Sequence, residues 1–371
     1  MRILQIVNSL THTSIPVEVA CEMMKTEDVE IAALYNTQKE ADQFAEDMRI
    51  GCKIYGFGYN KDKVKGLKDY IGFLKRCSYD VINTHHSLSG TLARIYCYGR
   101  IKLVHTVHAN YHSYTKGQNF LIGSTLNRTD AVVFNSKSSQ VGLYDWEKKK
   151  IKNVRQEVIY NGVNVDRIQN ASDEFWKRFC IQNGIQDDDI VLTQIGRLEP
   201  VKNPMGALQA FAHLRYEVDK EKWDRLRFVF MGNGSEYKKM SEFVNENNLM
   251  GKVFLPGVIK RDDVYSWMKR ADVLVVPSFY EGFCNTLVEG MVAGMPFTIS
   301  DLDVFKEIVP NDTGVVRFNP KDKKQMTMAM SNTLLGEKRK AKYSVYGRKK
   351  FGIENSVSGY FSLYSILTKK Q

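Results

Sequence analysis

Two carboxylates and two cations in the second half of the chain are suited to chemistry on a phosphorylated ligand. Glu281 follows an apolar run, and Glu289 lies in a helical pattern that begins near Asn285. Arg197 and Lys202 follow another apolar run. Backbone amides at a helix start attract anions, while Arg and Lys bind phosphate oxygens as a rigid fork and as a point charge. Together these residues predict a diphosphate site.

The start of this helical pattern has two interpretations, which fit equally well. In the first, free amides of Asn285, Thr286 and Leu287 face a bound anion. In the second, Thr286 and Glu289 form a capping box and Glu281 is an exposed loop acid.

The position of the two cations favours binding. Lys202 precedes Asn203 and Pro204, which fit the N-cap and N1 positions of a further helix. Most Arg and Lys side chains are simply solvated. Arg197 and Lys202, however, follow a strand-like run directly, at the edge where open α/β sheets bind ligands.

Glycines follow two later strand-like runs. The turn Gly232-Asn233-Gly234 would let the backbone approach a nucleotide, and Val258 follows Gly257 in a similar setting. Each feature alone also fits an ordinary turn.

Short apolar runs alternate with stretches of helical periodicity, as in parallel sheets. The pattern restarts after residues 161–164. We expect an α/β fold with two doubly wound, Rossmann-like domains facing a central cleft, residues 1–164 and 165–350, and a C-terminal helix in 351–371 that packs back on the first domain. The predicted strands are Ile3–Val7, Val29–Leu34, Val81–Thr84, Leu103–Val107, Ala131–Phe134, Glu157–Tyr160, Ile190–Ile195, Arg227–Met231, Val253–Leu255, Asp272–Val276, Phe297–Ser300 and Gly314–Arg317.

Composition limits the class of protein. The 371 residues are 43% hydrophobic, and 53 Lys and Arg against 42 Asp and Glu give a net charge of +11, which favours anionic partners. No signal-like leader, no membrane-length apolar run and no paired cysteine spacing is visible, so a cytoplasmic protein with reduced thiols is expected. No Gly-x-Gly-x-x-Gly follows the first strand-like run, which excludes a nicotinamide-dependent oxidoreductase.

Several histidines lie in the first half. His105, His108 and His112 raise the question of zinc, but no His-Glu-x-x-His pattern contains them. His85 and His86 end another strand-like run and fit a structural role at least as well as a place beside the cleft. We expect no metal and no cofactor.

These motifs together resemble the family 4 retaining glycosyltransferases of the GT-B fold. The resemblance rests on Gly196-Arg197-Leu198 through Lys202-Asn203, Gly232-Asn233-Gly234, Glu281 with Glu289, and Asn161-Gly162-Val163. The first half of the chain matches the family in its alternation of strand-like and helical stretches and in residues 104–108. Two departures stand out: residues Asn8 to Thr13 lack the glycine pair usual after the first strand, and Cys284 stands where Gly or Pro is common.

The resemblance implies a role for each matching residue. Arg197 and Lys202 would neutralise the donor diphosphate, Glu289 would bind the ribose, and Glu281 would contact the donor sugar. His108 would lie near the reacting centre. The implied catalytic residues are His108, Glu281, Arg197 and Lys202, and the implied donor-binding residues are Arg197, Lys202, Gly232, Asn233, Gly234, Val258, Glu281, Phe283, Asn285, Thr286, Leu287 and Glu289.

The expected activity is therefore a metal-independent, hexosyltransferase-type transfer. It would move a sugar from a nucleotide donor, UDP favoured over GDP, to a glycan or lipid-linked acceptor in cell-surface polysaccharide biosynthesis. Two alternatives remain open: a GT-B sugar-nucleotide epimerase, and a basic nucleic-acid or membrane binding protein without catalysis. Nucleic-acid binding would need a recognisable module, and none is present.

Residues 60–76 mix six cations and two acids with spaced apolar residues, and Lys148, Lys149, Lys150 and Lys152 form a second basic cluster. The first pattern fits either a membrane-surface helix or a surface helix whose apolar face packs in the core. Peripheral contact with the anionic inner face of the cell membrane is thus a further expectation.

Overall fold

The protein is described by a computed structural model that covers residues 1–11, 14–108, 115–310, 315–335 and 340–369. The chain divides into two compact units. Unit 1 comprises Met1–Gly162 and Ile353–Gln371, and unit 2 comprises Val163–Gly352.

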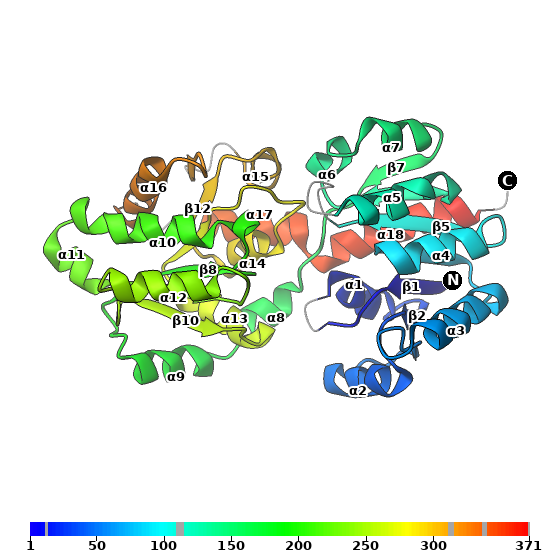
Figure 1. Cartoon of the computed structure of the whole chain (residues 1–371), viewed down its shortest axis with the longest axis horizontal. Coiled ribbons are helices and arrows are strands. Elements are labelled where there is room, and N and C mark those ends of the chain that lie inside the picture. The colour runs from blue at the N-terminus through cyan, green and yellow to red at the C-terminus, as the bar shows by residue number, and fades with distance from the viewer. Residues whose placement is uncertain (12–13, 109–114, 311–314, 336–339, 370–371) are drawn as a thin grey trace. The chain divides into compact units, whose positions relative to one another are not determined.

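Unit 1 is built on a seven-stranded parallel sheet with strand order β3-β2-β1-β4-β5-β6-β7 (Figure 1). Its strands are β1 (Arg2–Val7), β2 (Asp28–Ala33), β3 (Ile54–Gly56), β4 (Val81–Thr84), β5 (Lys102–Val107), β6 (Ala131–Phe134) and β7 (Arg155–Val158). Its helices are α1 (Ile15–Met23), α2 (Gln38–Met48), α3 (Lys63–Arg76), α4 (Ser87–Cys97), α5 (Lys116–Ser124), the 3₁₀ turn η2 (Leu126–Arg128), α6 (Lys137–Val141), α7 (Asp145–Lys150) and α18 (Ile353–Thr368).

Apolar side chains bury both faces of this sheet, as a doubly wound fold requires. One cluster joins the sheet to α1, α2 and α18, and another joins it to α3 and α4. The C-terminal helix α18 is part of this core: Tyr364 accepts a hydrogen bond from Asn83 at 3.0 Å, and the Tyr360 hydroxyl lies 3.2 Å from that of Thr106.

Unit 2 is built on a six-stranded parallel sheet with strand order β10-β9-β8-β11-β12-β13. Its strands are β8 (Ile190–Ile195), β9 (Leu226–Met231), β10 (Val253–Gly257), β11 (Val273–Val276), β12 (Phe297–Ser300) and β13 (Val316–Phe318). Its helices and 3₁₀ turns are α8 (Val165–Gln169), α9 (Glu174–Asn183), η3 (Pro200–Lys202), α10 (Pro204–His213), η4 (Leu214–Tyr216), α11 (Lys220–Arg225), α12 (Tyr237–Glu246), α13 (Arg261–Arg270), α14 (Asn285–Ala293), α15 (Asp303–Ile308), α16 (Lys323–Leu335) and α17 (Lys340–Phe351).

Two Rossmann-like sheets were expected, and both are present. Strand β3 is not predicted from the sequence, because three residues at a sheet edge carry too short an apolar pattern to recognise. Strand β7 begins and ends two residues earlier than the predicted Glu157–Tyr160. The ladder pairs Arg155 with Ala131 and Val158 with Phe134, so β7 ends where the four-residue β6 ends. Of the last predicted strand, Gly314 lies outside the described residues.

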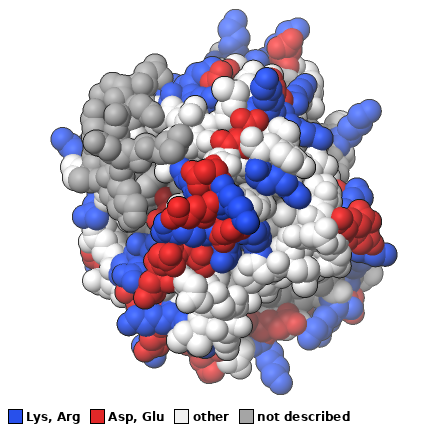
Figure 2. Space-filling view, turned by 90° about the vertical axis from the view of Figure 1, so that its left-hand side faces the viewer, with Lys and Arg blue, Asp and Glu red and all other residues white. Residues whose placement is uncertain are grey.

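Charge is mixed on the surface that Figure 2 shows. Lys and Arg side chains are interspersed there with Asp and Glu side chains. A continuous basic surface, such as nucleic-acid binding requires, is not seen on this face. None of the described helices is long and apolar enough to cross a membrane.

Glu147 gives the stability of unit 1 an expected pH dependence. Its carboxylate is fully buried, Oε2 accepts the Tyr144 amide at 3.0 Å, and Oε1 has no partner among the described residues. Burial raises the pKa of Glu147 to about 7. Because the folded pKa lies above the unfolded one, stability falls as the pH rises from the unfolded pKa through about 7.

We therefore expect Glu147→Gln to raise the melting temperature at pH 8, where the wild type must bury a charge. At pH 5 the melting temperatures of the wild type and the variant should differ less. Thermal unfolding of both at each pH measures this, and an equal difference at the two pH values would contradict it.

Candidate functional site

The carboxyl ends of β8 and β9 carry two loops that are bonded to each other. The Gly196 amide donates to Met231 O at 2.9 Å, and the Leu198 amide donates to Asn233 O at 3.0 Å. Leu198 is buried, whereas Arg197 between them is exposed. The pairing of the two loops thus holds the Arg197 backbone at the edge of the sheet and leaves its side chain in solvent.

Glycine is required in the second loop because the first loop lies so close. A Cβ on Gly232 would come 1.8 Å from Gly196 O, and one on Gly234 would come 2.4 Å from Leu198 O. Gly232 also has φ +144°, which L side chains rarely adopt. The close approach at this turn is therefore to the β8 loop.

Lys202 ends the turn η3, and helix α10 follows at Pro204. Asn203 is the N-cap with φ 51°, but its side chain makes no cap bond and donates instead to Pro320 O at 3.0 Å. Gln194 Nε2 holds the Lys202 carbonyl at 3.0 Å. The helix starts where the sequence predicted, but the left-handed backbone conformation of Asn203 was not predicted.

Lys202 and Glu281 form an ion pair, with Nζ 2.5 Å from Oε1. Ser278 Oγ donates to the same oxygen at 2.7 Å. Burial opposes the charge on Lys202, but the Glu281 carboxylate outweighs it and the pKa of Lys202 is raised. Lys202 is therefore charged and held in one place.

Arg197 adds a second positive charge to this region. Its charge acts electrostatically on Lys202. Its guanidinium has no hydrogen bond or ion pair within the described part of the chain. Arg197 is thus an available fork beside a fixed point charge, an arrangement that suits an anion with several oxygens.

Helix α14 begins at Asn285 after Cys284, which is its N-cap in a left-handed conformation with φ 76°. The amides of Leu287 and Val288 both donate to Cys284 O, at 3.2 and 3.4 Å. The expectation of three free amides is therefore wrong for Leu287, because the tight first turn uses its N–H. The φ value gives a physical reason why glycine suits position 284.

Glu289 lies one turn inside α14, so it is not in the first turn and the capping box does not form. Arg261 Nη2 lies 2.6 Å from Glu289 Oε1, and Tyr265 donates to the same oxygen at 3.1 Å. Glu289 is only 7% exposed. Arg261 and Tyr265 thus fix the carboxylate through Oε1.

The remaining residues expected at the donor site differ in exposure. The Phe283 ring is buried and packs on Phe351 with centroids 5.6 Å apart, so its side chain belongs to the core of unit 2. Val258 is 78% exposed just after β10. An exposed apolar side chain at this edge can cover the flat face of a ligand ring.

In unit 1, His108 follows β5 and is bonded through its ring to a buried neighbour. His108 Nε2 lies 2.8 Å from His85 Nδ1, and Asn135 Nδ2 donates to the His108 carbonyl at 2.8 Å. Burial lowers the pKa of His108 to about 3. The imidazole is neutral at physiological pH.

The other described histidines form no metal site with His108. His105 Nδ1 lies 2.9 Å from both Thr84 Oγ1 and Arg94 Nη1 within the core. His86 Nδ1 accepts the Asn8 amide at 3.1 Å. His112 and the end of the Asn8 to Thr13 segment lie outside the described residues, among which no group of three His, Cys, Asp or Glu is placed to hold a metal.

Sequence reasoning missed several partners of these residues. Arg261, Tyr265, Ser278 and Gln194 each fix a predicted site residue or its backbone. Arg261 follows β10 closely, as Arg197 follows β8, and that shared placement was the available signal. The others sit in a helix, a loop and a strand where polar residues are common.

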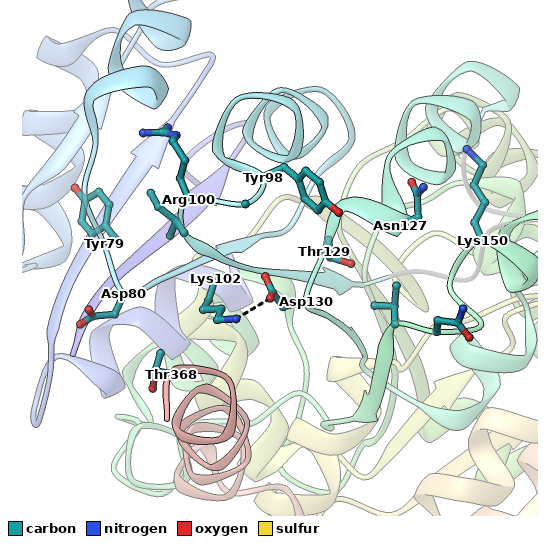
Figure 3. Close-up of a pocket in the computed structure, with 14 residues that line it drawn as sticks. Tyr79, Asp80, Tyr98, Arg100, Lys102, Asn127, Thr129, Asp130, Lys150 and Thr368 are labelled. Carbon is teal, nitrogen blue, oxygen red and sulfur yellow. Dashed lines mark hydrogen bonds and ion pairs between the residues drawn. The ribbon is translucent and has the colours of Figure 1, made fainter. Parts of the chain in front are cut away.

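A cavity of about 750 Å³ in unit 1 lies elsewhere, at the amino ends of β4 to β7 (Figure 3). There Lys102 pairs with Asp130 at 3.2 Å, and Arg100 donates to Leu74 O at 2.7 Å and Tyr96 O at 3.0 Å. These cations are already engaged by the protein. The cavity is therefore a poorer place for an anion than the edge that carries Arg197 and Lys202.

Family models match both halves of the chain. The model for glycosyl transferases group 1 matches residues 178–350, and the model for glycosyltransferase family 4 matches residues 28–167. The two matches fall in unit 2 and largely in unit 1, respectively.

Two relatives are named for different activities. An Escherichia coli UDP-Gal:alpha-D-GlcNAc-diphosphoundecaprenol alpha-1,3-galactosyltransferase is 26% identical over 304 residues, 78% of this chain and 76% of its own. An N-acetyl-alpha-D-glucosaminyl L-malate synthase of Bacillus anthracis is 24% identical, over 65% of this chain and 61% of its own.

Solved structures match the whole fold. Anabaena Alr3699/HepE in complex with UDP and glucose has a TM-score of 0.80 at 17% identity, covering 99% of this chain and 100% of its own. Sucrose-phosphate synthase from Thermosynechococcus elongatus has a TM-score of 0.78 at 16% identity, covering 99% of each chain.

The pairing of Glu289 with Arg261 leads to a stability prediction. Glu289→Ala would leave the buried Arg261 guanidinium without its carboxylate, and breaking a buried ion pair in this way costs about 3–5 kcal/mol. Urea unfolding measures the loss. In the control Glu281→Ala, the residue left without its carboxylate is Lys202, which is more accessible to water than Arg261. The free energy of unfolding should therefore fall less in this variant. An equal fall in both variants would contradict the prediction.

Proposed function

This chain belongs to glycosyltransferase family 4 and has the GT-B fold, and from that premise we propose that it transfers a sugar, with retention of configuration, from a nucleoside diphosphate to a glycan or lipid-linked acceptor. The observation that supports the donor half is the pairing of Lys202 with Glu281 beside the available Arg197 and the start of α14. These groups suit a diphosphate.

UDP is the nucleotide that we propose. The E. coli relative is named for a UDP-Gal donor, and the Anabaena structure was solved with UDP and glucose. In this chain, the Glu289 carboxylate would accept hydrogen bonds from the ribose hydroxyls, and the exposed Val258 side chain would lie against the base.

Departure of the diphosphate leaves negative charge on its oxygens and positive character on the anomeric carbon of the sugar. Arg197 and Lys202 would stabilise the first, and one such preorganised group is worth about 10²–10³ in rate. Glu281 would move from Lys202 toward the sugar hydroxyls as the diphosphate arrives. With two cations there, we propose that the transfer needs no metal and no cofactor.

His108 lies in unit 1, and we propose that unit 1 also binds the acceptor. We propose that the neutral His108 ring meets the transferred sugar by hydrogen bonding. The names of the two relatives include a diphosphoundecaprenol-linked sugar and L-malate, so we expect acceptors to differ within the family. A lipid-linked glycan in cell-surface polysaccharide biosynthesis is the acceptor that the net charge of +11 favours here.

Ligand-induced thermal stabilisation tests the donor site, since a ligand that binds only the folded state raises its melting temperature. With EDTA present, UDP should stabilise the wild type more than GDP does. Arg197→Ala removes one charge-assisted contact and should lower the affinity for UDP about 10- to 100-fold. Arg178→Ala, an exposed arginine on α9, is the matched control and should bind normally.

Two results would count against the proposal. Folded wild-type protein that no nucleotide stabilises would mean that the cations serve the structure only. Sugar released or rearranged without any acceptor requirement would favour the epimerase.

We also propose peripheral contact with an anionic membrane, through the surface formed by α5 and α7. Trp146 packs over Gly123, and Phe120, one turn earlier on α5, is 67% exposed. Lys148 and Lys149 follow two and three residues after Trp146 on the same short helix. Exposed aromatic residues beside lysines suit an anionic lipid surface.

Helix α3, the other basic segment, is less suited to this contact. Its Gly66, Tyr70 and Leu74 are buried, so its main apolar face is already used by the core of unit 1. This favours the surface-helix interpretation of residues 60–76.

Lys148→Glu/Lys149→Glu should therefore reduce co-sedimentation with phosphatidylglycerol-containing vesicles at low salt. Lys65→Glu/Lys68→Glu on α3 is the control with the same charge change, and it should retain most binding. If both double variants lost the same amount of vesicle binding, the binding would come from long-range charge attraction and not from the α5 and α7 surface. If the wild type did not bind the vesicles, the membrane proposal would be wrong.

A further inference from the structure

Three side chains form a hydrogen-bonded line in unit 1, and the proposed function uses only the last of them, His108. Gln5 comes from β1, His85 follows β4 and His108 follows β5. His85 Nε2 lies 2.7 Å from Gln5 Oε1, and His85 Nδ1 lies 2.8 Å from His108 Nε2. Gln5 and His85 are buried, so water does not compete for these bonds.

The line has a direction because its first member is a carbonyl oxygen, which can only accept. Gln5 Nε2 faces the Met23 sulfur, a weak acceptor, at 3.5 Å, which leaves Oε1 toward His85. His85 Nε2 must then carry a proton. Burial lowers the pKa of His85 well below its ordinary value, so the ring is neutral and its Nδ1 has no proton.

A bare Nδ1 on His85 needs a donor, and His108 Nε2 is the group beside it. His108 must therefore carry its proton on Nε2. Since this ring is neutral too, His108 Nδ1 is unprotonated. Among the described residues Nδ1 has no hydrogen-bond partner, while Asn135 holds the His108 carbonyl.

We propose that Gln5 and His85 are positioning residues that keep the proton of His108 on Nε2, so that Nδ1 is a hydrogen-bond acceptor for a hydroxyl of the transferred sugar. The inference rests on the proposed function, in which His108 meets that sugar. It adds a preference: a neutral acceptor takes a hydroxyl but gives no bond to a carboxylate. A carboxylate placed at this position would therefore gain no hydrogen bond from His108 Nδ1.

Histidine-selective ¹⁵N labelling of the full chain tests the proton positions directly. Two-bond ¹H–¹⁵N spectra distinguish protonated from bare ring nitrogens, and the loss of one pattern in His108→Asn assigns that residue among the seven histidines. His213, which belongs to unit 2, is an internal control that no variant should change. We expect a protonated Nε2 and a bare Nδ1 on both His85 and His108.

Gln5→Met removes the carbonyl but keeps the length of the side chain. His85 then loses the acceptor for its Nε2 proton, so the His108 proton should shift in part to Nδ1. Met23→Leu is the matched core control: it changes another neighbour of Gln5 and should keep the wild-type tautomer. Thermal unfolding of both variants checks that each is folded.

Turnover provides a second readout. Gln5→Met should lower kcat/KM with a neutral UDP-hexose about 10-fold, the lower end for loss of an orienting partner, and Met23→Leu should not.

The inference is overturned if wild-type His108 carries its proton on Nδ1, or if Gln5→Met leaves the tautomer unchanged. It is also overturned if His108→Ala turns over at the wild-type rate. Absence of turnover with every nucleotide sugar would instead count against the proposed function, and the spectra would still decide the tautomer.

Discussion

The close approach of the loops after β8 and β9 is the constraint on which the candidate donor site depends. Backbone bonds between Gly196 and Met231 and between Leu198 and Asn233 join the loops, and there is no room for a side chain at Gly232. Arg197 is exposed as a result, while the chain turns back so that Lys202 meets Glu281. Neighbouring parallel strands make this possible because their carboxyl ends share one edge.

The two units offer a ligand different electrostatic surroundings. In unit 2, carboxylates are paired with fixed cations: Glu281 with Lys202, and Glu289 with Arg261. In unit 1, burial keeps His85 and His108 neutral, and their ring nitrogens are oriented through Gln5. Charged groups suit a diphosphate, and neutral acceptors suit sugar hydroxyls.

Much of the fold could be predicted from the sequence, because buried parallel strands are nearly continuous apolar runs that are easy to recognise. The short edge strand β3 lacks such a run. At the site, the sequence predicted that Arg197, Lys202 and Glu281 follow strands and that Glu289 lies in a helix. It did not predict the partners of these residues. Arg261 reaches Glu289 from another helix, and the left-handed Cys284 tightens the first turn of α14; both depend on tertiary packing that local patterns do not encode.

The central claim is that the edge of unit 2 binds the diphosphate of a nucleotide sugar. A crystal structure of the whole chain with UDP measures this most directly. The account predicts that the phosphate oxygens lie within hydrogen-bond distance of Arg197 and Lys202, with the ribose hydroxyls on Glu289. UDP bound away from these three residues, for example in the cavity beside Lys102, would contradict it.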